Sequence, residues 1–137
     1  MRTRLLTAAL VAAAVAVPVG AASLATTVSL NILGGYGNRT LRACGIVHHY
    51  TLRRHGRAIK VDGAVLPAPG GTLRIKLKVK RCLDGRFRTV WVGLASPQGA
   101  GAFQGVVPPR KRGFYFVRAY DEGSTVVKSD KQYFRVT

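Results

Sequence analysis

The fold is decided by residues 72–81, which read TLRIKLKVKR. Apolar and basic side chains alternate along this stretch with a period of two, as in a β-strand with one buried face. The buried face is expected to hold Leu73, Ile75, Leu77 and Val79, and the solvent face Arg74, Lys76, Lys78 and Lys80. We therefore predict a half-buried strand of an antiparallel sheet, with cations along its outer face.

The next residues predict the partner of this strand. Asp84-Gly85 is a strong signal for a two-residue hairpin loop, and the apolar stretch 86–94 follows it. This loop sets three apolar pairs: Val79 with Val90, Leu77 with Val92, and Ile75 with Leu94. A slip by one residue would bury lysines instead, so the pattern favours this register.

The rest of the chain predicts further short strands and, after residue 25, no helix. Apolar or alternating runs at 46–52, 58–66, 102–107, 114–120 and 131–136 are separated by turns rich in Pro and Gly. About seven short strands of this kind indicate one antiparallel β-sandwich over residues 45–137. Residues 26–44 are polar and Gly-rich, and we expect a loosely ordered lead-in there.

The N-terminal residues 1–25 resemble a secretory signal peptide. Arg2 and Arg4 precede an apolar run, and small residues ending at Ala25 supply a cleavage site. An uncleaved membrane anchor is the alternative, because the run is just long enough to span a bilayer. We expect cleavage and a protein that is secreted or associated with the cell envelope.

Charge is the strongest feature of the composition. The chain has 22 Lys and Arg against five Asp and Glu, and without residues 1–25 its formal charge is +15. Such a charge bears on partners and solubility rather than on fold. Outside a cell, the available anions are wall polymers, acidic lipid surfaces, nucleic acid and acidic proteins. The alternative is that the charge only keeps the protein dissolved.

The two cysteines, Cys44 and Cys82, are expected to form a disulfide in an exported chain. A Cys–His nucleophile would need one of His48, His49 and His55, but no orienting motif accompanies them. His48 and His49 point to opposite faces of a strand, so a shared metal is not expected. Carboxylates are few and scattered, so we predict no enzyme, no cofactor and no metal site.

Short motifs follow one another in a characteristic order over residues 45–137. They are GAV (63–65), DGRFRTV (84–90), GAF (101–103), GFYFVR (113–118) and FRV (134–136). This order resembles the Ig-like or fibronectin-type-III-like domains of secreted proteins from actinobacterial-type, high-GC bacteria. The resemblance implies an Ig-like sandwich and is nearly silent on activity, because such modules serve as spacers, adhesion units and wall- or glycan-contacting accessories. The cysteine pair and the lysine-rich strand depart from that pattern.

Two groups of side chains are candidate binding residues. The polyanion-binding group is Arg74, Lys76, Lys78, Lys80, Arg86 and Arg88. Lysines that protect a sheet edge from aggregation are the alternative explanation for it. The aromatic group is Trp91, Phe114, Phe116 and Tyr120. It would offer a surface for a protein partner, or for stacking of sugars or bases beside Arg118, unless the lead-in covers it through Leu41 or Ile32.

Trp91 lies opposite Lys78 in the predicted register, where a cation–π pair is one interpretation and plain packing the favoured one.

The prediction for the whole chain is a secreted, non-catalytic module that binds an anionic polymer of the cell envelope or surroundings. The alternatives are a structural or protein-interaction unit whose charge only solubilises it, and a small-ligand carrier.

Overall fold

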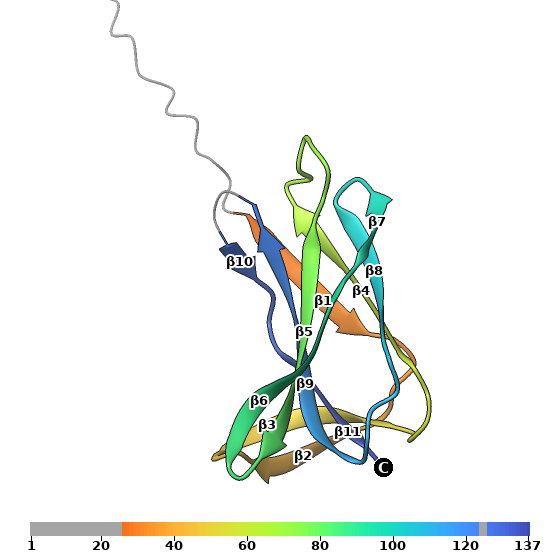
Figure 1. Cartoon of the computed structure of the whole chain (residues 1–137), viewed down its shortest axis with the longest axis vertical. Coiled ribbons are helices and arrows are strands. Elements are labelled where there is room, and N and C mark those ends of the chain that lie inside the picture. Colours follow the sequence, from red (N-terminus) through yellow and green to blue (C-terminus); the bar gives the residue numbers. More distant parts are fainter. Residues whose placement is uncertain (1–25, 124–125) are drawn as a thin grey trace, which may run out of the picture.

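Eleven strands and no helix make up the part of the chain that the structure describes, residues 26–123 and 126–137 of a computed structural model (Figure 1). They are β1 (Thr27–Ile32), β2 (Tyr36–Ala43), β3 (Ile46–Arg53), β4 (Ile59–Leu66), β5 (Ile75–Leu83), β6 (Arg86–Leu94), β7 (Ser96–Gly99), β8 (Ala102–Val107), β9 (Gly113–Glu122), β10 (Val126–Lys128) and β11 (Gln132–Val136). No helix in these residues has the length and hydropathy of a membrane span. The predicted signal peptide lies outside the described residues.

Two sheets form a β-sandwich, which confirms the predicted fold class with more strands than expected. The smaller sheet has the order β1-β4-β8-β7, and the larger one the order β2-β3-β11-β9-β5-β6, with β10 paired to β9. All pairs are antiparallel except β11 with β3. The main core between the sheets is formed by Val28, Leu30, Ile59, Val61, Val65, Ile75, Leu77, Val79, Ala95, Phe103, Val107, Tyr115, Val117, Ala119, Phe134 and Val136.

The expectation of a loosely ordered lead-in over residues 26–44 is wrong. This segment contributes β1 to the smaller sheet and β2 to the larger one. In β1, buried Val28 and Leu30 alternate with exposed Thr27, Ser29 and Asn31. The period of two was therefore present in the sequence, but it covers only a few residues before the Gly-rich turn.

The alternation over residues 72–81 is confirmed. The strand itself, β5, begins at Ile75 and ends at Leu83. Ile75, Leu77 and Val79 are at most 1% exposed, whereas the intervening lysines are half-buried on the opposite face. A strand buried on one face and cationic on the other is what the period of two requires.

The hairpin register is correct near its loop and wrong beyond it. Asp84 and Gly85 both have positive φ, as the predicted two-residue loop needs, and Lys80 pairs with Thr89. The register then shifts, and Val79 pairs with Trp91 instead of Val90. Further along, the shifted pairs are Leu77 with Gly93 and Lys76 with Leu94.

This bulge exchanges the faces of the second half of β6, because one extra residue reverses the alternation. Trp91 turns inward and packs against the main core. Val92 and Leu94 turn outward and are 48% and 59% exposed. Gly93 leaves room for the indole, since a Cβ there would lie 2.3 Å from the Trp91 ring.

A second, smaller core lies on the outer face of the larger sheet. It consists of buried Tyr50, Leu52 and Phe114, with Leu41, Ala43, Cys82, Phe87 and Tyr133 packed against them. Figure 1 shows why it forms: β2 and β3 cross the lower end of β5 and β9 at a steep angle, so the sheet folds over its own outer face.

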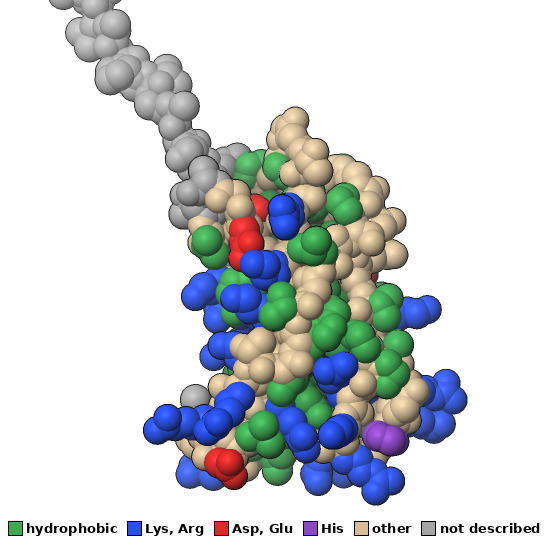
Figure 2. Space-filling view, in the orientation of Figure 1, with side chains coloured by type: hydrophobic (Ala, Val, Ile, Leu, Met, Phe, Trp, Pro, Cys, Tyr) green, Lys and Arg blue, Asp and Glu red, His purple; other side chains and the backbone are tan. Residues whose placement is uncertain are grey.

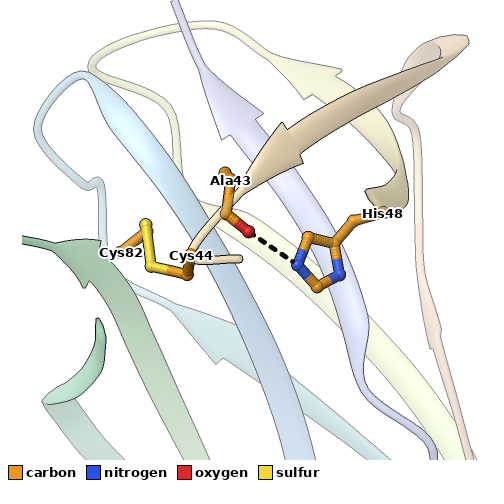
Figure 3. The surroundings of a disulfide bond; sticks show 4 residues. All are labelled: Ala43, Cys44, His48 and Cys82. Carbon is orange, nitrogen blue, oxygen red and sulfur yellow. Dashed lines mark hydrogen bonds between the residues drawn. A yellow bond between two sulfur atoms is a disulfide. The ribbon is translucent and has the colours of Figure 1, made fainter. Parts of the chain in front are cut away.

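The disulfide Cys44–Cys82 closes this fold and confirms the predicted pairing (Figure 3). Cys44 lies in the turn between β2 and β3, and Cys82 near the end of β5, so the bond joins two hairpins from opposite ends of the larger sheet. His48 Nε2 donates to the Ala43 carbonyl at 3.1 Å beside it. The His48 ring also packs 4.0 Å from the Tyr133 ring, centroid to centroid.

Candidate polyanion-binding surface

The structure keeps four of the six predicted basic residues together. Lys76, Lys78 and Lys80 share the outer face of β5, beside β9. Arg74 lies directly before β5 and is exposed. Alternate residues of a strand lie about 7 Å apart, so the three lysines form a regular row, with Arg74 just before its first member.

Arg86 and Arg88, the other two members of the predicted polyanion-binding group, do not belong to that row. Arg88 pairs with Arg81 and Arg86 with Leu83, whereas the neighbouring pair Lys80–Thr89 belongs to the lysine face. Successive residues point to opposite faces of a strand. The two arginines of β6 therefore lie on the other side of the pleat from Lys80.

The lysines of β5 also do not lie on an edge strand of the larger sheet. β5 lies between β9 and β6, so it is an interior strand of the larger sheet. Protection against edge-to-edge aggregation, which needs charges on an unpaired strand, does not explain them. The edge strand beside β5 is β6, and its outward residues opposite Lys78 and Lys76 are Val92 and Leu94 rather than charges.

Lysines cover two aromatic rings on this face. Lys78 Nζ lies 4.6 Å and Lys128 Nζ 5.9 Å from the centroid of the Tyr120 ring. Phe116 is flanked in the same way, with Lys131 Nζ at 5.1 Å and Lys80 Nζ at 6.0 Å. Long lysine stems bury apolar surface while the ammonium groups stay in water, so the basic side chains are themselves packed.

The predicted aromatic surface is therefore wrong. Phe116 and Tyr120 are only 3% and 8% exposed, and Phe114 is buried in the second core. Leu41 of segment 26–44 packs on the second core and so confirms the expected cover for Phe114, whereas Ile32 packs on the main core. Phe116 and Tyr120 are covered by lysines instead. Base or sugar stacking needs open ring faces, and these rings have none.

Trp91 is not part of an aromatic surface either. It is half-buried against the main core, which confirms plain packing. The alternative, a cation–π pair between Trp91 and Lys78, requires the unbulged register; Lys78 contacts Tyr120 instead.

Three basic residues of this face were not included in the predicted polyanion-binding group: Arg118, Lys128 and Lys131. Arg118 pairs with Lys78 across β9 and β5, and its Nε donates to Ser129 O at 2.7 Å. Lys128 pairs with Tyr120 through β10. β10 has only three residues, too few for a recognisable period, so only the tertiary pairing brings Lys128 here. We call the whole set the basic row: Arg74, Lys76, Lys78, Lys80, Arg118, Lys128 and Lys131.

Very little negative charge balances the basic row. In the described ranges, the one ion pair within 4 Å joins Lys76 Nζ to Glu122 Oε1 at 2.8 Å. The hydrogen bond from Lys76, assisted by the nearby charges of Lys78 and Arg74, lowers the pKa of Glu122. Figure 2 shows Lys and Arg gathered along one side and the lower end of the visible face, with few acidic side chains among them.

The histidines occupy separate places. His48 is buried in contact with the second core, while His49 on the opposite face is exposed, as the strand alternation predicted. Within residues 26–123 and 126–137, no three His, Cys, Asp or Glu side chains are grouped closely enough to hold a metal ion.

Comparison with known proteins gives no relative: no protein family and no curated protein sequence matches the chain significantly. The resemblance to bacterial Ig-like domains stays a prediction.

Proposed function

We propose that the protein is an exported, non-catalytic module that binds an anionic polymer along the basic row. The observation that carries this proposal is the row itself, seven cations on or directly beside one sheet face, of which only Lys76 has a carboxylate partner in the described ranges. Adjacent lysines about 7 Å apart repel one another by roughly 0.6 kcal/mol per pair in water. A bound polyanion turns this repulsion into attraction and releases counterions.

Export is supported by two independent features. Residues 1–25 have the order of a signal peptide. The Cys44–Cys82 disulfide is of the kind that forms and persists in oxidising compartments outside the cytosol.

The packing of the lysines suits this role. Lys78, Lys80, Lys128 and Lys131 rest on buried rings, so part of their side-chain freedom is already lost before a ligand arrives. Preorganised side chains reduce the entropic cost of binding. Because the rings are covered, we expect recognition of regularly spaced charge without selection among bases.

The test compares two variants of equal net charge. One carries Lys78→Gln, Lys80→Gln, Lys128→Gln and Lys131→Gln, and the control carries Arg39→Gln, Arg42→Gln, Arg54→Gln and Arg57→Gln at exposed sites elsewhere. Affinity for double-stranded DNA and for polyphosphate is measured against sodium chloride concentration. We expect the salt slope on DNA to shrink on the order of 3 to 4 units in the first variant only. Equal losses in both variants would show that total charge, and not the row, governs binding.

A second candidate function is protein interaction through the edge strand β6, where Val92 and Leu94 are exposed beside the lysines of β5. The fitting partner is an extended segment with alternating acidic and apolar residues, because strand addition would bring its acids near Lys76 and Lys78. A second copy of this chain, with the same positive charge, does not fit. A synthetic peptide of alternating Val and Glu should bind, and should lose affinity in the Val92→Glu, Leu94→Glu variant, where like charges would stand beside its acids; unchanged affinity there would exclude this candidate.

A further inference from the structure

A second group of cations lies at one end of the sandwich, on the other side of the pleat from the basic row. It surrounds a cavity of about 310 Å³ lined by Arg81, Val90, Pro109, Arg110, Lys111 and Tyr115. The cavity forms where the β5–β6 hairpin meets the segment 108–112 that leads into β9.

Arg81 is fixed at this cavity by the backbone. Its Nη2 donates to Arg112 O at 2.8 Å, and its Cζ lies 5.7 Å from the centroid of the Tyr115 ring. The guanidinium also lies against Gly113, where a Cβ would come within 2.8 Å of Nε. A glycine at 113 therefore leaves the room that the guanidinium occupies.

On the other side of the cavity, Arg110 and Tyr115 are also fixed by hydrogen bonds to backbone carbonyls. Arg110 Nε donates to Pro108 O at 3.0 Å, and the Tyr115 hydroxyl donates to Lys111 O at 2.7 Å. Neither bond involves a carboxylate. The backbone thus positions the two arginines while leaving their charges uncompensated.

The local balance of charge is unfavourable without a ligand. Arg88 stands directly opposite Arg81 in the hairpin, and like charges in that relation destabilise a sheet. None of these cations takes part in an ion pair, since the one such pair in the described part of the chain is Lys76–Glu122. An anion in the cavity would offset the repulsion.

We propose that this cavity binds a phosphate monoester, with the phosphate between Arg81 and Arg110 beside Lys111, and the organic part against Val90 and Pro109. Two guanidinium groups match the oxygens of a phosphate through paired N–H donors. Several unpaired cations favour a doubly charged group over a single carboxylate. The volume lies at the lower end of the range for small-molecule sites, and it includes apolar walls that inorganic phosphate would not use.

The source of the phosphate is either a free small ester or the terminal phosphate of a polymer. Both present the same group to Arg81 and Arg110. This proposal is independent of the basic row, because Arg81 and Lys80 point to opposite faces of β5.

The test measures binding of glycerol 3-phosphate, inorganic phosphate and glucuronate to the full-length mature protein by calorimetry and by amide chemical shifts. We expect glycerol 3-phosphate to bind at least tenfold more tightly than glucuronate and more tightly than inorganic phosphate, with shifts at Val90, Lys111 and Tyr115. A polymer with a terminal phosphate that binds tightly, while the dephosphorylated polymer does not, would identify the polymer as the source.

Three variants at the cavity and two control variants test which residues bind the phosphate. Arg110→Gln and the charge-preserving Arg81→Lys should each weaken binding at least tenfold, while Arg39→Gln, a matched loss of charge on β2, should leave it unchanged. Gly113→Ala should weaken it without any change of charge, provided that its amide spectrum shows a folded protein. The quadruple Lys→Gln variant of the basic row should retain binding. Loss of phosphate binding in that variant but not in Arg110→Gln, or equal affinity for glucuronate, would overturn the proposal.

Discussion

The ammonium group of Lys78 lies 4.6 Å from the centroid of the Tyr120 ring on the outer face of the larger sheet. Lys128 approaches the same ring from β10. Tyr120 is therefore buried by charged side chains rather than by a further layer of protein. The same contact lowers the exposure of an aromatic ring and orders two cations of the basic row.

This relationship predicts a measurable coupling between Lys78 and Tyr120. Lys78→Met keeps a long apolar stem but removes the charge, and Tyr120→Leu removes the ring. In a double-mutant cycle the two changes should couple by about 0.5–1 kcal/mol in the free energy of unfolding, measured by urea denaturation. Additive effects would show that the ammonium group gains nothing from the ring.

The bulge in β6 predicts opposite sensitivities of adjacent residues. Trp91→Ala should lower the free energy of unfolding by about 2 kcal/mol, because it removes an inward side chain that packs on the main core. Val92→Thr should change it by less than about 0.5 kcal/mol, since Val92 faces solvent. If Val92 proved the more sensitive position, the strand would follow the unbulged register.

From the Cys44–Cys82 disulfide we predict that a large part of the free energy of unfolding depends on the oxidised state of the two cysteines. Cys44 and Cys82 are 38 residues apart, and closing a loop of this length stabilises by up to about 4 kcal/mol in the chain-entropy picture. The Cys44→Ser, Cys82→Ser variant should lose stability of this order in chemical denaturation, and reduction of the native protein should give a similar loss. Stability that is the same with and without reductant would contradict a constraining role.

Tyr115 predicts a loss of stability at high pH. Burial raises the pKa of its phenol above the ordinary value of 10.0, an effect that Arg81 and Arg110 partly oppose. The neutral phenol is thus favoured in the folded state, so its contribution is complete below the unfolded pKa and is lost as pH rises through the folded pKa. Ultraviolet titration of the native protein against Tyr115→Phe should isolate this late ionisation, and Arg110→Gln should move it still higher. An ionisation at or below pH 10 would contradict the burial of Tyr115.

Local sequence patterns are enough to predict much of the fold. The alternation at Ile75, Leu77 and Val79 identified a strand and its hidden face, because burial on one face of a strand requires a period of two. Asp84-Gly85 identified the hairpin loop, since both residues accept positive φ. The cysteine count identified the disulfide, because an exported chain with two cysteines has a single internal pairing to offer.

What the sequence by itself determined, then, is the fold class, the inward face of β5 and the cysteine pair, all of which follow from short-range pattern or composition. The tertiary structure alone decided which side chains meet. The bulge that turns Trp91 inward lies within the β5–β6 hairpin but leaves no mark in the alternation of residues. The folding of β2 over Phe114 and the position of Lys128 beside Tyr120 depend on how separate strands pair and pack. One inserted residue reverses every side chain beyond it, and no local period records where a distant strand will lie.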